Sequence, residues 1–407
     1  MYRDADEKFG GSLVDALQPL PGPRKVDFNR FLSLLMARLR RSRVPISAAE
    51  PWSVTMERER GGILARVWFL TKGCSWDARG ACTMCNYGSG PALSVDSMIR
   101  NVREGLRPID SDTFRLFLAP SGSLLDPHEV PTAALVKICE LANRAPGDEF
   151  ITETRPETID DVSLDLLLGG LPEKRVSIGM GLETSDSWVQ RFCVNKMTPP
   201  RSFAAAAHLL KARSIGVHMN VCLGTAFLST REAVLDSERS ARWALRNGAD
   251  LVIVFPLHVR PFTLLAHLWE RGRYRPPSLW SLVEVLHRLG PAFAGRVQIS
   301  WHRDYSSGDS TIASPTTCPQ CVGRVLRLLD RFRDEEDFSH VETMRSIDCP
   351  CRVQWMRDFD REPAVDRRRR VQEEYRMLAR SFELEDEWRT VCAELEEEDI
   401  PSQSLAG

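Results

Sequence analysis

Residues 62–90 read GILARVWFLTKGCSWDARGACTMCNYGSG, an apolar run followed by a loop that carries three cysteines. The first part, residues 62–71, is rich in β-branched and bulky apolar residues and therefore predicts a buried strand. Cys74, Cys82 and Cys85 follow at once and are separated by seven and two residues. In α/β folds the chemistry lies at the carboxyl ends of the strands, so we expect this loop at the mouth of a sheet.

Apolar runs like the first one recur along the chain and alternate with stretches of helical periodicity. Six further runs predict strands: FRLFLA (114–119), EFITET (149–154), RVSIGMG (175–181), VHMNVCL (217–223), DLVIVFP (250–256) and RVQIS (296–300). Helices are expected near residues 93–106, 131–144, 162–168, 201–213, 230–247 and 278–289. Strands that are apolar nearly throughout and are joined by helices predict an α/β fold with a covered parallel sheet.

The composition excludes several classes of protein. The chain of 407 residues has a net charge of −2 and a pI near 6.5, which give no general attraction to nucleic acid or to an anionic membrane. No apolar run reaches about 18 residues and the chain does not start with an apolar signal region, so we expect a cytoplasmic protein without membrane contact. Arginine outnumbers lysine by 47 to 7, a usage typical of GC-rich genomes such as those of actinomycetes.

Eleven cysteines in a chain without an export signal indicate metal binding or catalysis rather than disulfides. Four single cysteines in apolar contexts are expected to be inert buried thiols: Cys139, Cys193, Cys222 and Cys392. Four others form a late C-x2-C…C-x-C set: Cys318, Cys321, Cys349 and Cys351. Four thiolates with no open position suit a structural zinc ion. An auxiliary iron–sulfur cluster or free thiols are the alternatives, because the C-x-C spacing is tighter than in the usual zinc knuckle.

The three cysteines of the first loop fall one ligand short of a closed metal site. Thiolates select zinc or iron–sulfur clusters, and a structural zinc ion takes four protein ligands. Three thiolates suit a [4Fe–4S] cluster with one iron left open, which can bind the amino and carboxylate groups of S-adenosylmethionine. Electron transfer then yields a 5′-deoxyadenosyl radical. The usual spacing for this chemistry is three and two residues, so zinc and other metals remain alternatives at this point.

Further motifs resemble the radical SAM superfamily, in the branch of the elongator and archaeosine synthase radical SAM subunits. These motifs are SGSLLDPHEVP (121–131), TETRPETI (152–159), GMGLETSD (179–186), VNKM (194–197) and RPFTLLAHLWERGRYRPPSLWSLVEVL (260–286). The branch shows a long first gap between the cysteines, as this chain does. The resemblance implies a partial (β/α)6 parallel barrel over residues 60–315. Helical periodicity at 28–43 predicts a helical extension before the barrel (1–59), and the cysteines and charge runs after residue 315 predict a small cysteine-containing segment with a charged helical tail (316–407).

The resemblance also implies which residues bind S-adenosylmethionine: Met84, Ser121, Gly122, Ser123, Glu153, Arg155 and Glu183. The turn of small residues at 121–123 is expected to bind the methionyl ammonium, and Glu153 the ribose hydroxyls or the ammonium. Arg155 is expected to pair with a carboxylate, Glu183 to face the same pocket and Met84 to pack on the adenine. An ordinary turn and strand-end ion pairs are the structural alternatives.

Two histidines at later strand ends are candidates for acid–base catalysis. His218 lies in VHMNVC, where the alternation places His218, Asn220 and Cys222 on one face of the strand. This face is a candidate lining of the barrel interior. His258 follows the next strand. A hydrogen-bonded core histidine is the alternative for the first, and a purely structural loop residue for the second.

The segment WDARGACTMCNYG (76–88) looks especially like the radical SAM diol dehydratase of apramycin biosynthesis. That likeness implies hydrogen abstraction from an amino-sugar substrate and loss of water, with a separate NAD(P)H-dependent reductase completing the deoxygenation. A flavodoxin or ferredoxin is the expected electron donor. Composition and weak net charge favour this interpretation, and nucleic acid is not expected as a partner. The alternatives are C–N cleavage in a modified tRNA base, as in the archaeosine branch, and a non-enzymatic, metal-stabilised binding protein.

Overall fold

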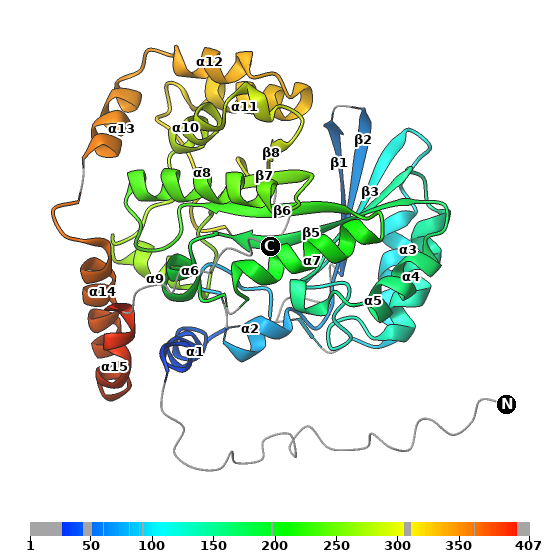
Figure 1. Ribbon diagram of the computed structural model, residues 1–407, viewed down its shortest axis with the longest axis horizontal. Helices are drawn as coiled ribbons and strands as arrows, with labels where there is room; N and C mark the ends of the chain where they lie inside the picture. Colours follow the sequence, from blue (N-terminus) through cyan, green and yellow to red (C-terminus); the bar gives the residue numbers. More distant parts are fainter. Residues whose placement is uncertain are drawn as a thin grey trace, which may run out of the picture.

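A computed structural model describes residues 27–43, 51–59, 61–80, 82–88, 90–91, 93–196, 198–304, 311–361 and 363–396 (Figure 1). Outside these residues lie the part of the expected N-terminal extension before residue 27, Met197 of the VNKM motif and the end of the charged tail. None of the helices in the described ranges combines the length and the apolar character that a membrane crossing requires.

A curled sheet forms the centre of the described part of the chain, and its eight strands follow one another in sequence order (Figure 1). They are β1 (Trp52–Glu59), β2 (Gly62–Phe69), β3 (Thr113–Pro120), β4 (Glu149–Glu153), β5 (Arg175–Glu183), β6 (Gly216–Leu223), β7 (Leu251–Pro256) and β8 (Val297–Ile299). β1 is antiparallel to β2, and every later pair is parallel. The predicted α/β half-barrel and its seven strands are therefore confirmed. β1 belongs to the N-terminal extension, for which only helix was expected.

Six helices connect the parallel strands and cover the outer face of the sheet (Figure 1). They are α3 (Val95–Leu106), α4 (Thr132–Arg144), α5 (Asp161–Gly170), α7 (Pro200–Ala212), α8 (Thr230–Arg246) and α10 (Leu279–Leu289). Between them and the sheet lies the main hydrophobic core, to which β6 contributes Val217 and Met219 and α7 contributes Phe203. Full burial of each such side chain stabilises the fold by about 1.5–3 kcal/mol. Ser229 and Glu232 form a capping box that starts α8.

The alternation along β6 decides which of its side chains face the inside of the half-barrel. Val217 and Met219 belong to the outer core beneath the helices. Because successive side chains of a strand point to opposite faces, His218, Asn220 and Cys222 point to the inner face. The strand therefore places these three side chains on one face, as the sequence predicts.

The two ends of the described chain meet in a second hydrophobic core. α1 (Phe28–Leu39) lies beside α14 (Arg367–Ser381) and α15 (Glu385–Val391) (Figure 1). The ring of Phe28 lies 5.1 Å from that of Tyr375, and the ring of Phe31 lies 5.5 Å from that of Trp388. The Tyr375 hydroxyl donates to the carbonyl of Phe192 at 2.5 Å. The N-terminal helix, the tail and the segment after β5 therefore form one unit.

The remaining helical elements are mostly short and flank the sheet. Those near its carboxyl edge are α2 (Ser75–Arg79), η1 (Pro156–Thr158), α6 (Ser187–Val189), the π-helical turn η2 (Gln190–Val194) and α9 (Leu264–Glu270). Those after α10 are η3 (Pro291–Phe293), α11 (Val322–Glu335), α12 (Ser339–Arg345), α13 (Pro350–Asp360) and η4 (Cys392–Glu396). α12 packs on α10, α13 on α8 and α11 on β1, so the cysteine-containing annex contacts the barrel at several elements.

Candidate active site

The first three cysteines lie on the loop between β2 and α3, at the carboxyl edge of the sheet. Cys74 precedes the short helix α2, and its N–H donates to the carbonyl of Tyr87 at 3.0 Å, which joins the two ends of the loop. Thr83, between the second and third cysteines, is buried, and its hydroxyl donates to the carbonyl of Cys193 at 2.6 Å. The loop is therefore held both by itself and by the segment that follows β5.

The three cysteines are half-buried, and their surroundings penalise a bare thiolate. Burial raises the pKa of Cys82 to about 12 and raises the pKa values of Cys74 and Cys85 as well. The charge of Asp77 adds to this effect at Cys85, and the thiols also raise one another's pKa values. A metal that replaces the protons and shares the negative charge removes this penalty. Three soft donors on one loop therefore fit an iron–sulfur cluster.

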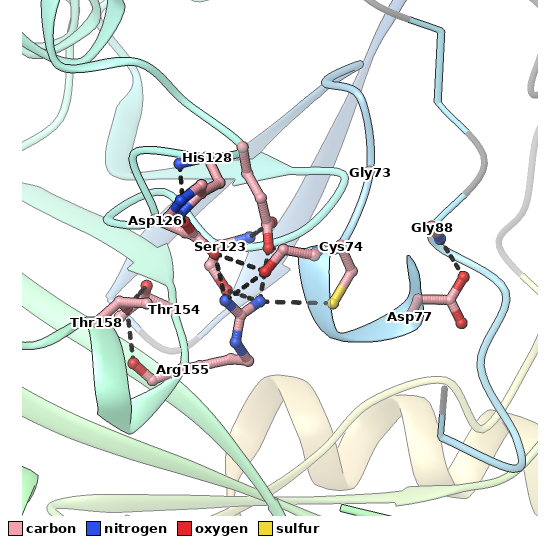
Figure 2. Close-up of polar contacts among 12 residues, drawn as sticks. Gly73, Cys74, Asp77, Gly88, Ser123, Asp126, His128, Thr154, Arg155 and Thr158 are labelled. Atoms are coloured by element: carbon pink, nitrogen blue, oxygen red, sulfur yellow. Dashed lines mark hydrogen bonds and ion pairs between the residues drawn. The ribbon is translucent and has the colours of Figure 1, made fainter. Parts of the chain in front are cut away.

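Arg155, directly after β4, is the hub of a polar network that holds the loop at Cys74 (Figure 2). Its Nη1 donates to Glu129 Oε1 at 2.6 Å and to the sulfur of Cys74 at 3.5 Å, and its Nη2 pairs with Asp126. The buried Glu129 also accepts the N–H of Ser75 at 2.7 Å. Burial alone would lower the pKa of Arg155, but its bonds to Glu129 and Asp126 raise it. Because the guanidinium is engaged by protein carboxylates, its contact with a ligand carboxylate stays a prediction.

The turn at 121–123 fastens β3 to the cysteine loop. The buried Ser121 accepts the N–H of Thr71 at 2.8 Å through its hydroxyl. Gly122 has a φ of +151°, and a Cβ at this position would come within 1.9 Å of Glu129 Oε2, so the turn requires glycine. The N–H of Ser123 donates to the same carboxylate oxygen at 2.6 Å. The turn is therefore part of the scaffold, and its contact with the methionyl ammonium stays a prediction.

Two carboxylates face the inside of the half-barrel at the carboxyl ends of β4 and β5. Glu153 Oε1 accepts a hydrogen bond from Asn220 Nδ2 at 2.7 Å, and burial raises the pKa of Glu153. Glu183 accepts from Lys196 Nζ at 3.0 Å and from the thiol of Cys222 at 2.7 Å. Its φ of +65° is a left-handed conformation that is uncommon for a non-glycine residue. Cys222 is therefore buried, as expected, but is hydrogen-bonded to a candidate cofactor-binding residue.

The two candidate histidines lie apart from the cysteine loop. Burial lowers the pKa of His218 to about 4, so its ring is neutral at pH 7. It lies two residues before Asn220 on the inner face of β6. The ring of His258 is hydrogen-bonded on both sides, through Nδ1 to Ser314 Oγ at 3.1 Å and through Nε2 to the Trp301 carbonyl at 2.7 Å. Burial also lowers the pKa of His258. Acid–base catalysis by either residue stays a prediction.

The structure shows contacts of the site residues that the sequence did not reveal. Met84 packs against the second core, and its stacking on adenine stays a prediction. Asp126 and Glu129 were part of the motif at 121–131 but were not singled out, although both are buried anchors of Arg155. Asp77 was likewise overlooked within the cysteine loop. Acidic residues beside glycines and cysteines in an otherwise apolar region are the signal that could have identified them.

The sulfur atoms of the four late cysteines lie close together. Cys318 Sγ lies 3.6 Å from that of Cys321 and 3.4 Å from that of Cys349. Cys351 Sγ lies 3.5 Å from Cys321 Sγ and 3.4 Å from Cys349 Sγ, and all four sulfurs lie within 4.8 Å of one another. With Zn–S bonds of about 2.3 Å, a tetrahedral zinc site separates its sulfurs by about 3.8 Å. The spacing therefore fits one tetrahedral ion better than a four-iron cluster. Trp280 Nε1 donates to Cys351 Sγ at 3.2 Å and ties the site to α10.

Comparisons with known proteins place the chain in a family. No protein-family model matches it. Archaeosine synthase subunit beta of Methanosarcina acetivorans is 30% identical over 300 residues, which cover 72% of this chain and 84% of that protein. The protein of the same name from Thermococcus kodakarensis is 28% identical over 282 residues, 68% of this chain and 85% of that one.

The chain also matches solved structures, at lower sequence identity. Elp3 of Methanocaldococcus infernus gives a TM-score of 0.44 at 15% identity, over 58% of this chain and 59% of that one. Methylornithine synthase also gives a TM-score of 0.44, at 13% identity, over 81% of this chain and 91% of that one.

A half-barrel of parallel strands with a three-cysteine loop after the first of them agrees with the resemblance to the radical SAM superfamily. The chain belongs to the radical SAM family that includes archaeosine synthase subunit beta. The resemblance implies a [4Fe–4S] cluster and S-adenosylmethionine, and both stay predictions for this chain. The named relatives favour the archaeosine branch, and the likeness to the apramycin enzyme stays a prediction.

Proposed function

We propose that Cys74, Cys82 and Cys85 hold a [4Fe–4S] cluster and that S-adenosylmethionine binds beside it, at the carboxyl edge of β3, β4 and β5. When bound, these groups supply a 5′-deoxyadenosyl radical that abstracts a hydrogen atom from the substrate. The observation that carries this proposal is the convergence of the cysteine loop, the turn at 121–123 and Glu153 on one edge of the sheet.

The chain's own residues have separate roles in this arrangement. Arg155 contacts the sulfur of Cys74 and Glu129 accepts the N–H of Ser75, so we assign them a positioning role. Glu153 and Glu183 present carboxylate acceptors to the inside of the half-barrel, where ribose hydroxyls and the methionyl ammonium need partners. Covered parallel strands around them exclude water from the radical. A flavodoxin or ferredoxin is the electron donor that this chemistry requires.

The first candidate reaction is of the archaeosine synthase type. Its support is the 30% identity to archaeosine synthase subunit beta over 84% of that protein. The resemblance implies cleavage of a C–N bond in a modified tRNA base, with a partner enzyme that makes the precursor. Under this reading tRNA is a partner, contrary to the expectation drawn from the net charge.

The second candidate is dehydration of a 1,2-diol in an amino sugar, followed by reduction by an NAD(P)H-dependent partner. Its support is the charge on the inner face of the half-barrel. Inner-face positions of β1 to β4 carry four carboxylates and two guanidinium groups: Glu57, Glu59, Glu149, Glu153, Arg66 and Arg115. The excess of negative charge favours a polar, cationic substrate over an anionic one.

The two candidates are separated by one experiment on the anaerobically reconstituted protein with S-adenosylmethionine and a reductant. Formation of 5′-deoxyadenosine is measured with tRNA that carries the modified base and, separately, with a panel of amino-sugar pseudosaccharides. Deuterium transfer from a labelled substrate into 5′-deoxyadenosine identifies the substrate class. Cys82→Ala is the matched control and is expected to form none. A cluster-replete protein that never forms 5′-deoxyadenosine contradicts the proposal.

We also propose that the late cysteines hold zinc. The support is the spacing of the four sulfurs, 3.4–3.6 Å for the closest pairs, which suits a tetrahedral ion. The site joins the starts of α11 and α13 to α10 through Trp280, so the ion has a structural role. Metal analysis of protein purified without added iron tests this. About one zinc ion per chain supports the assignment, whereas iron with labile sulfide at these cysteines overturns it.

A further inference from the structure

Two arginines at the end of α1 reach across to the cysteine loop. Arg40 and Arg43 both pair with the carboxylate of Asp77, and the Arg43 Nη1–Asp77 Oδ2 distance is 2.7 Å. The side chains of the three residues are only 8%, 11% and 2% exposed. Asp77 Oδ2 also accepts the N–H of Gly88 at 2.6 Å. A buried charge is costly unless it is paired, so these contacts hold α1 and both limbs of the loop together.

The same guanidinium groups bind backbone carbonyls at the end of the loop. Arg40 Nη2 donates to the carbonyl of Cys85 at 2.5 Å, and Arg43 Nη2 donates to that of Asn86. Arg40 Nε donates to the carbonyl of Phe262 at 3.1 Å, in the segment that leads into α9. Each planar guanidinium therefore fixes several acceptors at once, which a lysine cannot do. One of these acceptors belongs to a cysteine that we assign to the cluster.

The arginines are themselves anchored by the far end of the chain. α1 packs through Phe28 and Phe31 on Tyr375 and Trp388 of the tail helices. The N–H of Phe28 also donates to Glu394 Oε1 at 3.2 Å. The tail therefore contacts α1, and the arginines at the end of α1 contact the cysteine loop.

We propose that Arg40 and Arg43 are positioning residues that hold the cysteine loop in the conformation that retains the cluster. This inference rests on the proposed function only for the identity of the bound group. The arginines order the loop before the cluster binds, so that the binding energy is not spent on ordering the loop. With Asp77 they add a net positive charge beside the cysteines, which favours the reduced cluster.

The experiment compares Arg40→Gln and Arg43→Gln with wild type and with Arg40→Lys, all in the full chain. Arg41→Gln is the matched control, because Arg41 is a neighbouring arginine that is exposed. Three quantities are measured: hydrogen exchange of the amides at 74–88 in the metal-free protein, the rate of iron release to a chelator, and the reduction potential of the cluster.

We expect the glutamine variants to release iron about 10 to 100 times faster than wild type, which corresponds to about 1.4–2.8 kcal/mol and lies near the range for loss of a charged hydrogen bond. Their loop amides exchange faster while α1 stays protected, and the potential falls. Arg40→Lys keeps the charge, so its cluster should have the reduction potential of the wild type. It should still release iron faster than the wild type. Arg41→Gln behaves as wild type.

Wild-type exchange at 74–88 and wild-type iron release in both glutamine variants overturn the inference. If a variant unfolds as a whole, Arg40→Lys supplies the test, since equal retention in wild type and lysine variant also overturns it. If the wild type holds no cluster, the proposed function fails, and the exchange data on the metal-free chain still decide whether the arginines order the loop.

Discussion

Glu129→Gln tests the network that fixes the backbone around Cys74. Glu129 is 0% exposed and accepts three donors, the N–H of Ser75 at 2.7 Å, the N–H of Ser123 at 2.6 Å and Arg155 Nη1 at 2.6 Å. Glutamine has a single oxygen, so its NH2 group must face a donor. Breaking a buried ion pair costs about 3–5 kcal/mol. Arg155 keeps its pairing with Asp126, so we expect the low end, a loss of about 3 kcal/mol.

Urea unfolding of the metal-free protein, followed by tryptophan fluorescence, measures this loss as a lower midpoint with an unchanged slope. Glu157→Gln is the matched control, because Glu157 binds the same arginine at 2.9 Å but is 48% exposed. An exposed pair contributes at most about 1 kcal/mol, so this variant should unfold near the wild type. If Glu129→Gln and Glu157→Gln destabilise the protein equally, the account of the buried network is wrong.

Three further predictions follow from the same contacts. Gly122→Ala should lower the free energy of unfolding by about 2 kcal/mol or more, because the backbone is left-handed and the new Cβ meets Glu129. Gly272→Ala is the control and should lower it less, because a Cβ at Gly272 meets open space. His218 has a folded pKa of about 4, so the unfolded chain binds its proton first as the pH falls below about 6.5. The contribution of His218 to stability should therefore fall by up to about 3 kcal/mol between about pH 6.5 and 4. Other buried histidines with lowered pKa values, such as His258 and His267, add to the fall, so His218→Gln should reduce it by the share of His218 alone. An unchanged pH profile in the variant contradicts this. Cys318→Ser, or a chelator, should remove the metal of the annex and lower the thermal midpoint, and a metal-loaded variant with an unchanged midpoint contradicts the structural role.

The parallel sheet could be predicted from the sequence because its strands are buried on their outer face and read as apolar runs. DLVIVFP and VHMNVCL are examples, since each is bounded by helical stretches. β1 could not be found in this way. Its sequence WSVTMERE places charged residues on the inner face, so it lacks the apolar signal, and only its pairing with β2 reveals it.

The cysteines of the site could be predicted because their chemistry is carried by residue type and local spacing. The network around them could not, because it depends on contacts between distant segments. Arg155 binds Glu129, which lies 26 residues away in the sequence, and Arg43 binds Asp77, which lies 34 residues away. Sequence alone showed Arg155 as a candidate for a ligand carboxylate, whereas the fold supplies protein carboxylates for it. The sequence predicts a charged helical tail, and only the structure shows that Tyr375 and Trp388 of this tail pack against α1.

The central claim is that three thiolates hold a cubane whose fourth iron is open to S-adenosylmethionine. Electron paramagnetic resonance of the reduced, anaerobically reconstituted protein tests it most directly. We predict a [4Fe–4S]+ signal that changes when S-adenosylmethionine is added and that is absent when Cys74, Cys82 and Cys85 are replaced together by alanine. A signal that persists in the triple variant, or one that does not respond to S-adenosylmethionine, would contradict the account.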